Sequence, residues 1–486
     1  MIAAFTAVVF LASAAIVAYL TDRVGLTISP FVVLVAAALA AAVVFIRLER
    51  SLPSDHTEST PFAAIVASIL AWLLWLARPS FLPIGSGPDL THHLALIDFV
   101  ERGWRLPHDP LLAAVLGEMV NYTPGAHLLA AVAGAWTRTD GFHAIYPVIA
   151  FSVALKAGLI FLIARHLMSD RVSRTAWALA AVLLLFAPRD YFIGSFADAS
   201  YLAQVVSEMF TIAMWLAIVV WTGQPSAPAS ALIGVFGVAT FLTWPVALGP
   251  VALLAAGTIA LRFGLTIRER LRHVAIAITP IAAVAVLHAL GRTNALAIVG
   301  VAGYVAYPHV GLFGWWFLVP AAAGVVISAF DRRTRTVSLF LMAIALQAAA
   351  LLVVARRVNA ARPYMALKMV YLAIYPMAAA GSLALAGVEG WIGRMGRIGR
   401  TGWTGRIGRM GGTGSNREPE ENLFPCSLSS PSSPSSLSSP SSLSRPSSLS
   451  CRSCPQSSRC NWPPRFHAVR PRLRNRDQHQ RRAHGP

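Results

Sequence analysis

The residues whose types and spacing could do chemistry gather in one polar stretch, residues 79–142. It includes the runs Gly85-Ser86-Gly87-Pro88-Asp89-Leu90-Thr91-His92-His93 and Asn121-Tyr122-Thr123-Pro124-Gly125-Ala126-His127. A carboxylate such as that of Asp89 can act as a general base or a metal ligand, and imidazoles can move protons or bind metal. The stretch therefore predicts an acid/base or metal-binding site.

Asp89 and His93 are four residues apart, so on a helix their side chains share one face. The pair could hold a divalent ion or form a hydrogen-bonded acid/base couple, although two ligands alone do not make a metal site. In the competing interpretation, Asp89 only caps a helix predicted over 89–102, where its charge suits the positive helix end. That helix is expected to turn three apolar side chains toward the membrane, namely Leu94, Ile97 and Val100.

Further carboxylates and one lysine stand at or inside apolar segments. Asp190 and Asp198 lie in a polar junction, where either could supply a second carboxylate or serve only as a loop residue. Glu208 is costly to bury as a charge, so we expect it to face the protein interior or a wet cavity. Lys156 lies deep in an apolar segment and needs a partner that the sequence does not identify.

A basic cluster precedes and begins the last apolar segment, and its members are Arg356, Arg357, Arg362, Tyr364 and Lys368. Such cations could hold a phosphate and stabilise it as it leaves. They could equally reach toward lipid headgroups. Lys368 is the stronger candidate because it belongs to the apolar segment and is not a loop residue.

The element type that must position these residues is a membrane-spanning helix. Of 486 residues, 56% are hydrophobic and only 13% are charged, which excludes an ordinary soluble domain. The fold class is an all-α polytopic membrane protein of about twelve spans, since each crossing takes about 20 apolar residues. The expected spans are 2–20, 28–46, 62–78, 143–164, 175–188, 203–222, 230–246, 248–263, 273–290, 311–330, 337–355 and 364–386.

Arginine clusters in alternate loops predict which side these loops occupy. These clusters fall on one side of the membrane only if the segment 111–137 does not cross it. They are Arg47 with Arg50 and three later clusters around 165–174, 268–272 and 332–335. The positive-inside rule makes that side the cytoplasm. Both termini are then inside and the loop 79–142 is extracytoplasmic, with 124–136 lying along the surface.

The composition changes after Gly390, so residues 1–390 form the membrane domain and 391–486 a tail. The tail holds 16 arginines against four acids and all four cysteines of the chain, so the net charge of +19 mostly describes the tail. Its Gly-Arg and Ser-Pro runs cannot bury a core, which predicts disorder. Three interpretations of the tail compete. It could be a cytoplasmic extension that touches anionic lipid, a frameshift product, or a zinc site on Cys451, Cys454, Cys460 and His467.

The order of these features resembles the GT-C superfamily of membrane glycosyltransferases, which use polyprenyl-phosphate-linked sugars. Asp89 matches the acidic position of the first large extracytoplasmic loop, and Tyr122-Thr123-Pro124-Gly125 with His127 matches the stretch that follows it. Ala164-Arg165-His166-Leu167 resembles the basic end of the next span. The acidic motif of those families often has a second acid, whereas Leu90 and Thr91 follow here.

The resemblance implies a sugar transferred to an extracytoplasmic acceptor, a glycan, lipid or protein, at the inner (plasma) membrane. Asp89 would be the catalytic base. The expected substrate-binding residues are His93, Tyr122, His127, Asp198, Arg357 and Lys368. A divalent metal on Asp89 and His93 is the one cofactor the pattern admits, and neither a nucleotide nor a nucleic acid is expected.

Two other classes of function compete with this one. A transporter or flippase for lipid-linked or small anionic substrates would place polar groups near the bilayer midplane, on broken helices in related halves. The polar residues here favour one early loop instead, and no internal repeat is evident. A non-catalytic scaffold is disfavoured by the costly charges of Glu208 and Lys156.

Overall fold

The computed structural model describes residues 1–51, 56–82, 88–168, 173–197, 199–290, 305–360 and 362–389. All of these residues belong to the unit Met1–Gly411, and the unit Gly412–Pro486 contains none of them. The predicted disorder and the alternatives for the tail 391–486 therefore lie outside the described residues.

The described residues are helical, with no strand among them, as the sequence predicts. The N-terminal helices are α1 Ile2–Arg23, α2 Pro30–Ser51, α3 His56–Leu76, α4 Pro88–Gly103, η1 Pro110–Leu112, α5 Ala113–Leu116, η2 Gly117–Asn121 and α6 Gly125–Thr137. The middle helices are α7 Gly141–Leu167, α8 Arg174–Leu184, α9 Arg189–Phe192, α10 Gly194–Ala197, α11 Leu202–Gly223 and α12 Ala227–Thr243. The last are η3 Pro245–Ala247, α13 Leu248–Ala260, α14 Ile267–Ala289, α15 Val310–Phe313, α16 Trp315–Phe330, α17 Arg335–Arg357 and α18 Tyr364–Tyr371, after which residues 374–389 are again helical.

Within the described part, eight helical segments are long and apolar enough to cross a membrane. They are Ile2–Arg23, Pro30–Arg50, Thr57–Leu76, Gly141–Leu167, Leu202–Gly223, Ile267–Ala289, Arg335–Arg357 and Tyr364–Glu389. The other four predicted spans fall on the shorter helices α8, α12, α13 and α16, of 11, 17, 13 and 16 residues. The structure thus supports a polytopic membrane protein, and eight of the twelve expected spans have spanning length.

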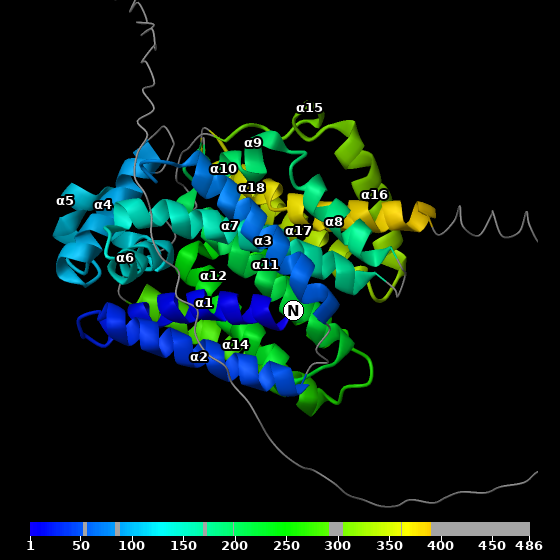
Figure 1. The fold of residues 1–486 in the computed structure, drawn as a ribbon, viewed down its shortest axis with the longest axis horizontal. Helices are drawn as coiled ribbons and strands as arrows, with labels where there is room; N and C mark the ends of the chain where they lie inside the picture. Colours follow the sequence, from blue (N-terminus) through cyan, green and yellow to red (C-terminus); the bar gives the residue numbers. More distant parts are fainter. Residues whose placement is uncertain are drawn as a thin grey trace, which may run out of the picture. The chain divides into compact units, whose positions relative to one another are not determined.

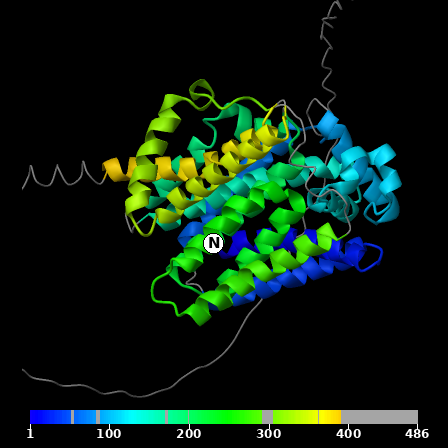
Figure 2. The ribbon, with the colours of Figure 1, turned by 180° about the vertical axis from the view of Figure 1, so that it is seen from behind.

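The helices pack around α7 and α11, which are in contact with each other (Figure 1). The spans on α7 and α11 are 83% and 89% buried, whereas those on α2, α3, α14 and α17 are only 17–28% buried. The exposed side chains on these outer helices are largely apolar, so they suit contact with lipid. Figure 2 shows the same arrangement from behind.

The polar stretch after α3 folds into α4, α5 and α6, which lie together at one end of the helical bundle (Figure 1). One expectation for this region is wrong. Ile97 and Val100 are fully buried and do not face the membrane, because α4 packs on α6 and α7. Every residue of α6 from Gly125 to Val132 is buried within the protein.

Close contacts explain why α4 lies against α7. Gly141, the first residue of α7, has no Cβ, and one built there would lie 2.4 Å from Cγ2 of Ile97. The Gly141 backbone N–H donates to Oε1 of Glu101 at 2.6 Å. A missing side chain and a hydrogen bond from the first turn of α7 thus allow the two helices to meet.

Polar contacts join helix ends at both ends of α1. At one end, Arg165 is buried and donates to Glu58 at 3.1 Å and to Thr175, and the chain N-terminus lies 3.9 Å from Glu58. At the other, Asp22 accepts from the backbone of Leu106 at 2.8 Å. Arg165 therefore belongs to an ion pair that is largely shielded from solvent and joins α7 to α3.

Candidate functional site

A histidine pair stands where α4 and α6 meet. Nδ1 of His93 and Nε2 of His127 are 2.8 Å apart, and the two rings stack with centroids separated by 5.0 Å. The Tyr122 ring meets both imidazoles edge-on, at 5.6 Å from His93 and 5.7 Å from His127. Three residues named from the sequence are therefore in direct contact, although 34 positions separate the histidines.

Both imidazoles are held neutral. Burial lowers the pKa of His127 to about 4, against a smaller opposing effect of the Pro124 carbonyl. Burial also lowers the pKa of His93 well below its usual value, and the neighbouring His127, Lys368 and His92 add to this. Desolvation disfavours the charged form of a histidine. At neutral pH the pair therefore offers hydrogen-bond donors and acceptors and carries no positive charge.

The stretch Thr123-Pro124-Gly125 anchors this pair to α12. The Thr123 hydroxyl donates to the Thr243 carbonyl at 3.1 Å. A Cβ on Gly125 would lie 2.8 Å from the Leu242 carbonyl oxygen, so only glycine allows this approach. The resemblance treated the stretch as a substrate-binding motif, and the structure gives Thr123 and Gly125 a packing role.

Lys368 brings the last apolar segment to the same place. It lies on α18, and its ammonium is close enough to His93 to act on the His93 pKa. Nζ of Lys368 sits 3.8 Å from the centroid of the Tyr201 ring and 4.2 Å from that of Tyr364. Electron-rich ring faces attract a cation at such distances. The Lys368 ammonium thus lies against two tyrosine rings, and we call His93, His127, Tyr122 and Lys368 the histidine cluster.

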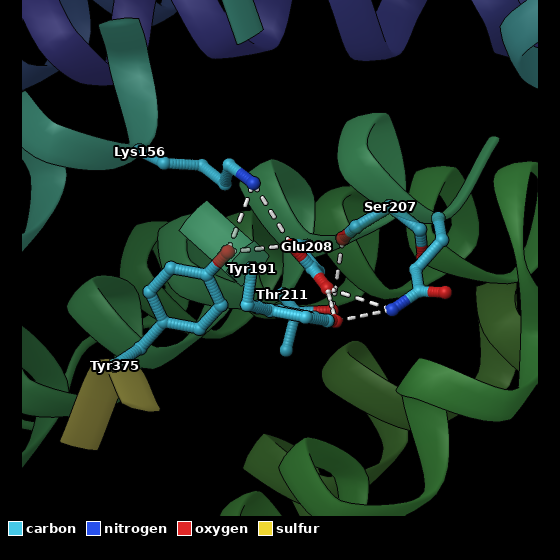
Figure 3. A network of polar contacts seen from close by, with 7 residues as sticks. Lys156, Tyr191, Ser207, Glu208, Thr211 and Tyr375 are labelled. Carbon is cyan, nitrogen blue, oxygen red and sulfur yellow. Dashed lines mark hydrogen bonds and ion pairs between the residues drawn. The ribbon is translucent and has the colours of Figure 1, made fainter. Parts of the chain in front are cut away.

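A second buried polar group surrounds Glu208, on α11 (Figure 3). Oε2 of Glu208 accepts from Nζ of Lys156 at 2.8 Å and from the Tyr375 hydroxyl at 2.5 Å. Oε1 accepts from the Tyr191 hydroxyl at 2.5 Å and from Nε2 of Gln204 at 3.0 Å. The partner that Lys156 requires is therefore Glu208, and we call these five residues the Glu208 network.

The last apolar helix is interrupted beside this network. Residues 372–373 form a turn between α18 and the helix 374–389. Pro376 explains the interruption, because it lacks the N–H that would bond to the Leu372 carbonyl and its ring crowds that carbonyl. Tyr371 and Tyr375 therefore stand on either side of a break in the helix.

Among the other residues predicted to be catalytic or substrate-binding, only Arg357 has a described side chain. Arg357 is exposed at the end of α17, whereas Lys368 is buried. Asp198 lies outside the described residues. Asp89 belongs to α4, one turn before His93, but its side chain, like that of Asp190, is outside the described part. Within that part, no three His, Cys, Asp or Glu side chains gather as a metal site.

The sequence analysis missed Tyr191, Gln204 and Tyr375, and it gave Tyr201 no role. A signal for Tyr375 exists, since the spacing of residues 364, 368, 371 and 375 follows one face of a helix. That face carries Tyr364, Lys368, Tyr371 and Tyr375, and all four are buried. Gln204 also had a signal, since it lies in α11 four residues before Glu208, on the same helix face. Tyr191 belongs to the four-residue helix α9, where periodicity gives no comparable signal.

The chain was compared with protein families and with curated proteins. No protein-family model matches it, and no curated protein matches it.

Proposed function

We propose that this protein is a membrane glycosyltransferase of the GT-C kind, which moves a sugar from a polyprenyl-phosphate-linked donor to an extracytoplasmic acceptor. The observation that carries the proposal is the buried contact of His93, Tyr122 and His127, three residues of the loop that resembles the catalytic loop of those enzymes. The buried Lys368 ammonium, which lies against two tyrosine rings, is the cation that we assign to the lipid phosphate. The twelve-span arrangement with both termini in the cytoplasm belongs to the same proposal.

In the proposed reaction, an acceptor hydroxyl attacks the anomeric carbon of the donor sugar and inverts it. The new bond joins the acceptor oxygen to that carbon, and the bond from that carbon to the phosphate oxygen breaks. Asp89 takes the hydroxyl proton, as a general base must. The electron pair of the broken bond leaves with the phosphate, whose growing negative charge the Lys368 ammonium stabilises.

The histidines orient the sugar in this scheme. Because His93 and His127 are neutral, they can donate to or accept from sugar hydroxyls without repelling or neutralising the nearby lysine. Tyr122, edge-on to both rings, fixes their tilt. Arg357 is exposed and would meet the donor only at the membrane surface, as a headgroup contact.

The test uses membranes that contain the wild type or one of two variants, incubated with a panel of polyprenyl-phosphate sugars. Asp89→Asn removes the proposed base, and Asp98→Asn removes a carboxylate from the same helix whose contact is an exposed pair with Arg102. We expect Asp89→Asn to lose at least a hundredfold in transfer rate, since a general base contributes about 10²–10⁴. Full activity in Asp89→Asn would refute its role, and no donor consumption by wild type would refute the transferase.

A transporter is the second candidate, because the Lys156–Glu208 pair lies inside two spans. Helices are also interrupted beside polar residues in two places, between α12 and α13 and at 372–373. The contacts of the first break argue against it. Its carbonyls already accept from Ser207 at 3.1 Å, Thr123 at 3.1 Å and Gln347 at 2.6 Å. Carbonyls so occupied are poorly placed to coordinate an ion, so the enzyme is the better supported of the two.

A further inference from the structure

We propose that Glu208 is a positioning residue for Lys368: its carboxylate fixes α18, and with it the cation beside the histidine pair. The chain of contacts runs from α11 through two tyrosine hydroxyls to the two segments of the last helix. Each contact is between side chains that are almost completely buried, so water does not compete with it.

The first link is direct. The Tyr375 hydroxyl donates to Oε2 of Glu208 at 2.5 Å, and Nζ of Lys156 donates to the Tyr375 oxygen at 2.8 Å. Tyr375 belongs to the helix 374–389, beyond the break at 372–373. The carboxylate therefore holds the helical segment that follows the break.

The second link reaches α18 itself. Tyr191 donates to Oε1 of Glu208 at 2.5 Å, and its ring stacks on that of Tyr371 at 4.5 Å with the planes 8° apart. Tyr371 is the last residue of α18 and also donates to the Ala306 carbonyl at 2.8 Å. One carboxylate thus holds both sides of the break, one oxygen to each side.

The third link connects these tyrosine contacts of Glu208 to the Lys368 ammonium. Lys368 precedes Tyr371 by three residues, so the two side chains lie on one face of α18. The Tyr201 ring that receives the Lys368 ammonium stands at the start of α11, seven residues or two helical turns before Glu208. The segment 201–208 therefore reaches α18 twice, directly through the Tyr201 ring at the Lys368 ammonium and through Tyr191 at the Tyr371 ring.

The residue type matters because four donors converge on Glu208. A carboxylate offers two acceptor oxygens, whereas the amide of glutamine offers one and adds two donors. Lys156 supplies the opposite charge, and the pair is fully buried. A hydrophobic contact could pack the same helices, but it could not fix the two tyrosine hydroxyls.

The test measures how often α18 leaves its place, by cysteine labelling in full-length protein whose four tail cysteines are replaced by serine. The reporters are Ala366→Cys on α18 and Ala144→Cys on α7, which are matched in exposure at 6% and 5%. Each is made alone, in the wild-type background and with Tyr375→Phe or Tyr191→Phe. The measured quantity is the rate of reaction with a soluble maleimide in detergent.

We expect both tyrosine variants to speed labelling at Ala366→Cys by about tenfold, because a hydrogen bond to a charged group is lost. Labelling at Ala144→Cys should stay within about twofold, because α18 opens locally. Unchanged labelling at Ala366→Cys overturns the proposal. A parallel increase at both reporters also overturns it, since that shows general loosening.

A second readout deepens the proposed function and rests on it. In sugar transfer, Tyr375→Phe should raise the KM for the polyprenyl-phosphate sugar about tenfold and also lower kcat, because the displaced Lys368 both binds the phosphate and stabilises its growing charge. An unchanged KM would contradict the link to Lys368. If wild type transfers no sugar, the labelling result still decides whether Glu208 positions α18, so the two failures are distinguishable.

Discussion

The histidine cluster and the Glu208 network are both buried and polar, but they differ in how their charges are balanced. In the network, the Glu208 carboxylate and the Lys156 ammonium neutralise each other, and each carboxylate oxygen accepts hydrogen bonds from two donors. In the cluster, the imidazoles are neutral and the Lys368 ammonium rests on aromatic rings. The network therefore joins helices through an ion pair and hydrogen bonds, whereas in the cluster the lysine makes cation–ring contacts with Tyr201 and Tyr364.

The largest expected effect comes from breaking the charge balance of the network. Lys156→Met or Glu208→Gln leaves one charge buried without its counter-ion, which typically costs about 3–5 kcal/mol. The double variant removes both charges and should be clearly more stable than either single one. Thermal unfolding of the four proteins in detergent measures this, and additive losses in the double variant would show that the pair is not coupled.

Acid should weaken the histidine cluster. The folded pKa of His127 is about 4, below its ordinary 6.5, so between these values the unfolded chain binds more protons than the folded one. Stability should therefore fall as the pH drops from about 6.5 toward about 4, and level off above 6.5. The lowered pKa of His93 acts in the same direction.

The pH effect is checked by unfolding midpoints measured across this range. His127→Phe should flatten the dependence, because it removes one of the two responsible imidazoles. His309→Gln removes an exposed histidine and should leave the slope as it is in the wild type. An equal slope in wild type and His127→Phe would show that the buried pair does not set it.

A smaller effect is expected where the cluster is anchored to α12. Gly125→Ala places a methyl group 2.8 Å from the Leu242 carbonyl oxygen and should cost about 1–3 kcal/mol. Gly257→Ala in α13 is the matched control, because nothing lies within 4 Å of its Cβ. That change should be neutral or stabilise by about 0.5–1 kcal/mol. Equal unfolding midpoints in both variants would contradict the close approach.

The sequence predicts the helical elements better than their contacts. Apolar runs of about 20 residues locate the helices correctly, because lipid and protein interior both select for apolar side chains. Helices α12 and α13 each end three residues before the expected spans 230–246 and 248–263. At the end of α12 the Trp244 carbonyl accepts from Ser207 of another helix, a contact that the apolar pattern does not predict. Burial of Ile97 was missed for a related reason: periodicity does not tell lipid from a neighbouring helix.

In the candidate site, too, the sequence predicts which residues take part better than it predicts their partners. His93, Tyr122 and His127 were named from residue type and order, and the structure places them in contact. The pairing of Lys156 with Glu208 joins residues 52 positions apart on two helices, and only the packing of α7 on α11 brings them together. The sequence already favours Lys368 over the arginines because Lys368 belongs to the apolar segment, and in the structure Arg357 is exposed whereas Lys368 is buried against tyrosines.

The most direct test of the central claim, that the cation of the cluster receives a lipid phosphate, is a binding measurement on two variants. Purified wild type, Lys368→Met and Arg357→Gln are titrated with a fluorescent polyprenyl-phosphate sugar in detergent. We predict that Lys368→Met weakens binding at least about tenfold, the loss of one charge-assisted contact, while Arg357→Gln stays within about twofold. Equal losses in both variants, or a larger loss in Arg357→Gln, would contradict the account.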